Sequence, residues 1–257
     1  MLRPFSKLNK TALTAACLLA TSGCISINAA SLDYQETRNL NVSASNASML
    51  KVDAAAGFLK IVGEEGLEEV KVTADILAVD ENITLSLEQS GDTIELEADA
   101  NQKSHFNWRG KSPKIDLTVT VPMRMMLDIK DGSGFITVDN INNNVKIKDG
   151  SGSMDITNVK GNLDIDDGSG SVEIKHITGN VLVEDGSGSL EISQVTGTVD
   201  VEDGSGGLDI YDVGGLVTID DGSGSIHVKK LRNGLTIIEE GSGGLKMTDV
   251  EGPVSIK

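Results

Sequence analysis

The chain has 257 residues, of which 39% are hydrophobic and only 3% aromatic, and its formal net charge is −17. This length suits one long repeat domain or two small domains, and the aliphatic content supports a narrow core. Nucleic acids and anionic membranes attract proteins with a basic surface. The strongly acidic charge of this chain therefore excludes both as simple electrostatic partners.

The first residues have the pattern of an export signal. Residues 1–10 carry three basic side chains, and an apolar run of ten residues follows to Ala20. This run is too short to span a bilayer as a helix, but its length and flanking charge are typical of a signal peptide. We therefore predict a signal peptide over residues 1–23.

The run from Thr21 to Cys24 resembles the lipoprotein signal of bacteria, in which the Cys is lipidated and becomes the new N-terminus. Ser22, Gly23 and Cys24 match that pattern, whereas Thr21 stands where an aliphatic residue is usual. The resemblance implies that Cys24 is acylated. Several acyl chains at one Cys would hold the protein firmly at a membrane.

The same resemblance implies a destination. Ile25 rather than Asp follows the Cys, which implies an outer-membrane lipoprotein facing the periplasm or the cell surface, with a lipidated tether over residues 24–45. The alternative is ordinary cleavage after Ala30, which would discard Cys24. Cys17 and Cys24 are the only cysteines, so we expect no disulfide framework and no cysteine-based metal site in the folded part.

Residues 46–127 have the pattern of irregular β-structure. Residues 50–63 resemble a degenerate coil, and Ser90-Gly91-Asp92 separates two alternating runs, as in a hairpin. A further alternating strand, Lys114 to Val121, stops at Pro122. We expect this half to cap the N-terminal end of the repeats described below.

One polar loop concentrates the aromatic residues of this half. It contains His105, Phe106, Trp108 and Arg109, and Trp108 is the only Trp of the chain. The loop is a candidate ligand loop that contacts a glycan or a protein. Alternatively, it is a turn whose rings cover the end of the core.

Residues 128–257 contain a repeat with a period of 18 residues. The motif D-G-S-G begins at Asp131, Asp149, Asp167, Asp185, Asp203 and Asp221, and the related E-G-S-G begins one residue late at Glu240. Short fixed periods are typical of solenoids, in which each repeat packs only on its neighbours. The sequence predicts an all-β fold, a parallel β-solenoid (β-helix) that we expect to be right-handed.

Each repeat predicts two short strands and two corners. In the unit beginning at Asp167, Val172 and Ile174 alternate with polar residues, and so do Val181 and Val183, which indicates two half-buried strands of about three residues. One corner position is always Gly or Asn, so we expect positive φ there. Its residues are Asn143, Gly161, Gly179, Gly197, Gly215, Asn233 and Gly252.

The corners are also rich in carboxylates. From the third coil onward an acidic residue precedes each corner acid, and stacked like charges repel. Either turn hydrogen bonds and salt tolerate this repulsion, or a divalent cation such as Ca²⁺ or a basic partner offsets it. The candidate cation ligands are Asp167, Asp185, Asp203, Asp221 and Glu240.

No catalytic constellation emerges from the repeats. The serines recur once per coil, whereas a catalytic serine is single and lies beside a base. His105, His176 and His227 lack metal-ligand spacing. We expect no catalytic residues and no cofactor other than Ca²⁺.

The C-terminal coil leaves a strand edge open. Such edges tend to pair with another chain, and Pro253 removes only one donor from this one. End-on self-association is therefore expected to be accessible.

The irregular β N-terminal half, the strand end Val119-Thr120-Val121-Pro122 and the repeated D-G-S-G corners together resemble the bacterial "putative adhesin" family DUF4097. The resemblance covers residues 50–257 and implies a surface or envelope role without catalytic residues. We expect a non-enzymatic, adhesin-like envelope lipoprotein that binds or scaffolds an envelope protein or glycan. The alternatives are a calcium-tuned structural envelope protein and, third, a polysaccharide-acting enzyme.

Overall fold

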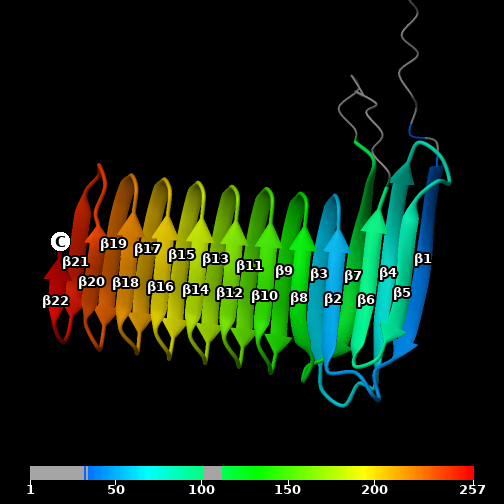
Figure 1. The fold of residues 1–257 in the computed structure, drawn as a ribbon, viewed down its shortest axis with the longest axis horizontal. Coiled ribbons are helices and arrows are strands. Elements are labelled where there is room, and N and C mark those ends of the chain that lie inside the picture. Colours follow the sequence, from blue (N-terminus) through cyan, green and yellow to red (C-terminus); the bar gives the residue numbers. More distant parts are fainter. Residues whose placement is uncertain (1–31, 33, 101–111) are drawn as a thin grey trace, which may run out of the picture.

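The computed structural model describes residues 32, 34–100 and 112–257, whose strands form two 11-stranded sheets along a rod (Figure 1). The first, sheet A, contains in spatial order β1 (Tyr34–Ser43), β4 (Glu69–Ala78), β7 (Lys114–Pro122), β3 (Gly57–Glu64), β9 (Gly134–Ile141), β11 (Gly152–Val159), β13 (Gly170–Ile177), β15 (Gly188–Val195), β17 (Gly206–Val213), β19 (Gly224–Leu231) and β21 (Leu245–Val250). The second, sheet B, contains β22 (Val254–Ile256), β20 (Leu235–Glu239), β18 (Val217–Asp221), β16 (Val199–Asp203), β14 (Val181–Asp185), β12 (Leu163–Asp167), β10 (Val145–Asp149), β8 (Met126–Asp131), β2 (Met49–Ala54), β6 (Thr93–Asp99) and β5 (Thr84–Ser90).

One coil of the rod is a sheet B strand, a Gly-Ser corner and a sheet A strand. Each residue of a regular coil pairs in parallel with the residue 18 positions later, as Val181 does with Val199 and Leu190 with Leu208. The predicted parallel β-solenoid with 18-residue coils is thereby confirmed, whereas the hand of the coil stays a prediction. The expected strand length of three residues is wrong, because the regular strands have five residues in sheet B and eight in sheet A.

The core is a thin aliphatic layer between the sheets. In a regular coil, inward residues alternate with outward ones, so the two strands contribute five buried aliphatic side chains. In the coil of β14 and β15 these residues are Val181, Val183, Leu190, Ile192 and Val195, each at most 2% exposed.

In the regular coils positive φ angles occur at two positions, and neither is the predicted one; of the predicted residues only Gly252, in the last coil, has a positive φ, of 87°. One is the last Gly of the corner, for example Gly170 with φ 152°, and the other is a non-Gly residue in sheet A, for example His176 with φ 58°. The predicted position, that of Gly179, has no positive φ in most coils. It needs Gly there because an added Cβ would lie 2.3 Å from the carbonyl oxygen of Gly161 in the coil below.

The left-handed residue explains a break in the alternation. Val172 and Ile174 point inward two residues apart, but the next inward residue, Ile177, follows after three. His176 takes up the extra residue, since the ladder pairs Lys175 and Ile177 with the next coil but leaves His176 out. Ile177 therefore lies in the core at the end of a strand.

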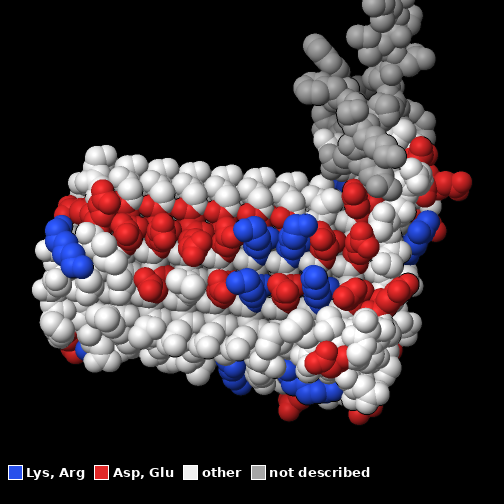
Figure 2. Space-filling model, in the orientation of Figure 1, with Lys and Arg blue, Asp and Glu red and all other residues white. Residues whose placement is uncertain are grey.

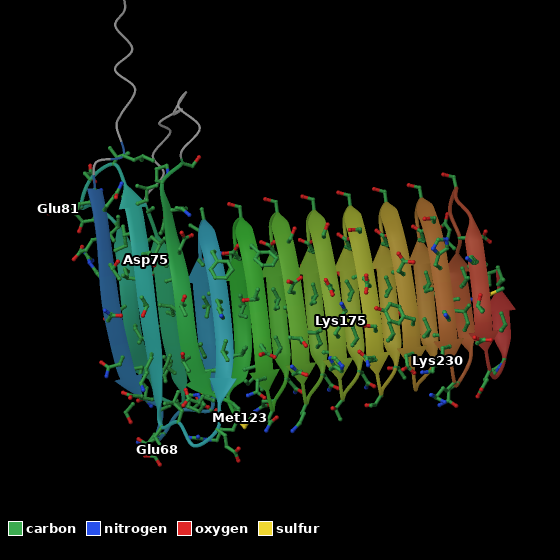
Figure 3. The ribbon with its side chains drawn as sticks, turned by 180° about the vertical axis from the view of Figure 1, so that it is seen from behind. Glu68, Asp75, Glu81, Met123, Lys175 and Lys230 are labelled. Carbon is green, nitrogen blue, oxygen red and sulfur yellow. The ribbon has the colours of Figure 1, made fainter. Side chains whose placement is uncertain are left out.

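The N-terminal part is threaded through the stack rather than simply placed at its end. The coil of β2 and β3 lies between β6 and β7 on one side and β8 and β9 on the other, in register with both. The chain passes this coil at the turn between β7 and β8, where Met123 lies (Figure 3). Beyond this coil the pairing is antiparallel: β1 pairs with β4, β4 with β7, and β5 with β6. The last of these pairs is the predicted hairpin.

The opposite end of the rod is open. The late seventh corner produces a register shift after Ile219, so that Asp220 pairs with Glu239 and Ile238 is left exposed. In the last coil, Met247 and Val254 are 41% and 46% exposed, although their counterparts in earlier coils are buried. Within the described residues, no helix is long and apolar enough to cross a membrane.

Candidate functional site

The most unusual feature of the rod is a column of aspartates in its interior. Each is the corner Asp of a regular coil and lies at the end of a sheet B strand, on the same side as the core residues. They are only 1–4% exposed: Asp131, Asp149, Asp167, Asp185, Asp203 and Asp221. We call these six residues the aspartate column.

The alternation of sheet B places the aspartate column inside. Val181 and Val183 point inward, Leu182 and Glu184 point outward, and Asp185 takes the next inward position. The two acids of each corner pair therefore lie on opposite sides of sheet B, because the second of each pair is buried. The period-two pattern already contained this signal.

The buried carboxyls are only partly satisfied by hydrogen bonds. The backbone N–H of Ser187 donates to Asp185 Oδ1 over 3.1 Å, and Ser205 and Ser223 make the same bond to Asp203 and Asp221. The Oδ2 atoms of these aspartates have no partner, and neither oxygen of Asp131, Asp149 or Asp167 accepts a hydrogen bond of standard geometry. The backbone N–H groups of Gly132, Ser151 and Ser169 still act on these three carboxyls and lower their pKa values, which partly offsets burial. In the coils of Asp185, Asp203 and Asp221 the corner serines therefore bond the column through their backbone N–H groups.

Burial shifts the acidity of the column. Burial first, and then the charges of neighbouring aspartates, raise the pKa of Asp131 to about 7 and the pKa values of Asp167 and Asp203 to about 6. Burial also raises the pKa values of Asp149, Asp185 and Asp221. These groups therefore hold protons at a pH at which surface carboxyls are ionised.

A row of acidic side chains lies outside the aspartate column, on the outer face of sheet B. It lines a groove of about 650 Å³ with the corner glycines, and acidic side chains run along this face in Figure 2. We call these residues the outer acidic row: Asp166, Glu184, Glu202, Asp220 and Glu239.

The outer acidic row is neutralised only at its N-terminal end. Lys148 forms an ion pair with Asp166, and in the same coils Lys146 Nζ lies 2.6 Å from Asp164 Oδ2. No ion pair of the described residues includes Glu184, Glu202 or Asp220. Three consecutive coils therefore present uncompensated carboxylates to solvent.

The structure does not bring the five predicted cation ligands together in one metal centre. Asp167, Asp185, Asp203 and Asp221 belong to the buried column, and Glu240 lies after the register shift, only partly buried. In residues 34–100 and 112–257, no group of three or more His, Cys, Asp or Glu side chains is placed to hold a metal ion. Calcium binding stays a prediction.

The remaining predicted site residues are dispersed or lie elsewhere. Cys24 and the candidate ligand loop with His105, Phe106, Trp108 and Arg109 lie outside the described residues. His227 is exposed, with its Nδ1 3.1 Å from Asp209 Oδ1.

Sequence reasoning missed an aromatic pair on the outer face of sheet A. The rings of Phe58 and Phe135 stack with their centroids 5.9 Å apart, because β3 and β9 pair in register. They line a hollow of about 730 Å³ together with Leu77 and Pro113. Both Phe residues follow a Gly at equivalent corner positions, which was the available signal.

Comparison with known protein families gives one match. The family model described as Toastrack DUF4097 matches residues 60–238. No curated protein matches the chain.

Solved structures with a similar course of the chain share little sequence with it. A "putative cell adhesion protein" from Clostridium sporogenes ATCC 15579 is 16% identical with a TM-score of 0.43, covering 87% of this chain and 99% of that one. A "putative adhesin" from Bacteroides fragilis NCTC 9343 is 14% identical with a TM-score of 0.42, covering 86% and 97%. A "putative lipid binding protein" from Parabacteroides distasonis ATCC 8503 is 14% identical with a TM-score of 0.33, covering 86% and 96%.

Proposed function

Because the chain belongs to the Toastrack DUF4097 family, we propose that it is a non-enzymatic, adhesin-like lipoprotein that binds or scaffolds a partner in the cell envelope. A binding role suits a rod whose coils repeat one surface in register, since many weak contacts add up by multivalency. Export and anchoring through Cys24 would place the rod outside the cytoplasm, at the outer membrane, facing the periplasm or the cell surface.

The outer acidic row is the surface that we propose for the contact. Glu184, Glu202 and Asp220 lie on consecutive coils without ion pairs, at a spacing of about 4.8 Å. A partner that carries basic groups along an extended segment would meet one carboxylate per coil. This uncompensated row is the observation on which the proposed contact depends.

The experiment compares two triple variants for binding to isolated envelopes. Glu184→Gln, Glu202→Gln and Asp220→Asn neutralise the outer acidic row. The matched control neutralises three outward acids of sheet A, Glu173, Glu191 and Asp209, which already have partners in Lys175, Tyr211 and His227. Figure 3 shows Lys175 on that opposite face.

We expect salt-sensitive binding of the wild-type rod that is at least tenfold weaker in the sheet B variant and unchanged in the control. Equal losses of binding in both variants would mean that binding depends on the net charge of the rod and not on the outer acidic row. If binding does not depend on salt and is equally strong in the wild type and both variants, the outer acidic row is not the contact surface.

A calcium-tuned structural role is the second candidate, favoured by the oxygen-rich groove of the outer acidic row. It predicts that millimolar Ca²⁺ raises the melting temperature of the wild type and that the sheet B triple variant loses this rise. Calorimetry without binding heat or a shift in melting temperature would end the calcium proposal.

We also propose end-on pairing with a second copy. The strands β21 and β22 end their sheets, and the inward residues Met247, Val254 and Ile256 are 41–46% exposed. A twofold axis across this end would extend both sheets by antiparallel pairing. Sedimentation should detect a dimer that Ile256→Lys dissociates; a wild type that stays monomeric at all concentrations contradicts this pairing.

A further inference from the structure

The aspartate column is continuous over six coils. Parallel pairing sets Asp131 beside Asp149, Asp149 beside Asp167, and so on to Asp221. Successive carboxyls therefore repeat at the coil spacing of about 4.8 Å, at positions that are 1–4% exposed beneath the groove of the outer acidic row. At the N-terminal end the same position holds Ala54, which pairs with Asp131, and Ala98, which pairs with Ala54.

Among the residues that the structure describes, no Lys, Arg or His forms an ion pair with this column. The nearest other titratable groups are acidic as well: Asp53 beside Asp131, Asp166 beside Asp167, and Asp220 beside Asp221. Lys130 and Lys148 are exposed and pair with Asp53 and Asp166 instead. The inward positions of sheet A opposite the column are aliphatic, for example Leu190, Ile192 and Val195.

The orphan oxygens identify what is missing. A buried acceptor without a donor is unfavourable, and a buried charge without a partner is more so. A proton supplies both needs, because a protonated carboxyl is neutral and donates its O–H to the carboxylate of the next coil. Every member of the column has at least one oxygen without a partner that could take part in such a bond.

We infer that the aspartate column is a proton-binding ladder, in which carboxyls of neighbouring coils share protons so that the regular coils take up protons as they fold. The rod then responds to the pH around it through its interior. This inference goes beyond the proposed binding role and does not depend on it.

The acidity of the column supports this and gives the direction. Its pKa values are raised in the folded chain, to about 7 at Asp131 and about 6 at Asp167 and Asp203, while an unfolded Asp titrates near 4, as in model peptides. The folded rod therefore binds more protons than the unfolded chain between these values. The resulting stabilisation is complete below about pH 4 and is lost as the pH rises through 6 to 7.

Three surface carboxyls act in the opposite direction. Hydrogen bonds from Arg38, Asn41 and Lys230 lower the pKa values of Glu36, Glu69 and Asp212, so their contribution is lost as the solution becomes strongly acidic. These groups are solvent-exposed and contribute little. Together they place the stability maximum in mildly acidic solution.

The test measures the melting temperature of the full chain between pH 4.5 and pH 8. We expect the wild type to melt roughly 5–10 °C lower at pH 8 than at pH 5. Asp167→Asn with Asp203→Asn should remove much of this slope, because an amide stays neutral and still supplies a donor. The control, Asp166→Asn with Glu202→Gln, neutralises the chain neighbours of those residues and should keep the wild-type slope.

A wild-type melting temperature that stays flat or rises from pH 5 to pH 8 overturns the inference, as does a full slope in the Asp167→Asn, Asp203→Asn variant. A second measurement covers a variant that does not fold. Refolding of the wild type at pH 6.5, followed calorimetrically in buffers of different ionisation enthalpy, should take up at least one proton per chain. Refolding without proton uptake would refute the ladder.

Discussion

Asp166 and Asp167 are neighbours in the chain but lie on opposite sides of sheet B. Asp166 pairs with Lys148 on the outer face, where its side chain is 44% exposed, whereas Asp167 is 2% exposed inside the rod. One residue of alternation therefore gives two neighbouring aspartates different surroundings, one ion-paired in solvent and one buried. The outer one is available for contacts with other molecules, and the inner one contributes to the internal chemistry of the rod.

The surface pair should contribute little to stability. Asp166→Asn removes the ion pair with Lys148 and should change the free energy of unfolding by about 0–1 kcal/mol at pH 7, because solvent screens exposed pairs. Urea denaturation measures the change, and 1 M salt should reduce it. A loss above about 2 kcal/mol would mean that the pair is part of the folded core's support.

The last glycine of each corner should be irreplaceable. Gly170 has φ 152°, and an added Cβ would lie 1.4 Å from the carbonyl oxygen of Gly152, so Gly170→Ala should cost at least about 3 kcal/mol or prevent folding. Gly207 is the control, because its Cβ would meet nothing within 4 Å and its neighbours in register are Ser189 and Ser225.

Circular dichroism during urea denaturation compares the two glycine variants. Gly207→Ala should stay within about 0.5 kcal/mol of the wild type. Equal losses in both variants would contradict the stacking of corner backbones that the structure describes.

The left-handed position in sheet A should prefer Asn. His176 has φ 58°, and Asn140 and Asn158 occupy the same position in earlier coils. His176→Asn should stabilise the rod by about 0.5 kcal/mol, and the β-branched His176→Val should destabilise it by about 1–2 kcal/mol. Scanning calorimetry gives the order of the three melting temperatures, and Val melting above His would reject the assigned conformation.

The lipid anchor that we propose requires Cys24. Cys24→Ser should move the protein from the membrane fraction to the soluble fraction and abolish labelling with a fatty acid, because thioether acylation needs the thiol. Cys17→Ser is the matched control and should stay in the membrane fraction. A Cys24→Ser protein that stays membrane-bound speaks for attachment by another route.

The sequence was sufficient for the architecture because the 18-residue period and the alternation of Val172 with Ile174 each have one structural solution. It was misleading at the Gly179 position, since Gly serves both positive φ and close backbone contact, and only the neighbouring coil distinguishes them. The left-handed His176 could not be predicted from residue type, because its column also contains Gln194 and Lys230.

The site was only partly predictable. The repeated pairs of corner acids were recognised in the sequence, but their burial was not predicted. The two acids of a pair are adjacent in the strand, so one points outward and the other, for example Asp185, points inward. Counting every second residue from Val181 gives Val183 and then Asp185, so the alternation could have shown that Asp185 points inward. The pairing of Phe58 with Phe135 depends on the out-of-order stacking of the coil of β2 and β3, which no local pattern in the sequence encodes.

The threaded N-terminal coil also has a mechanical consequence. A rod held by its N-terminus transmits tension first to β1, which lies at the edge of sheet A and can peel away one hydrogen bond at a time. The next strand, β2, is clamped between β6 and β8, so the load meets two hydrogen-bonded neighbours at once and must shear both. The fold thus combines an outer strand that detaches first with a second strand that is held on both sides, so force applied at the N-terminus would meet increasing resistance along the chain.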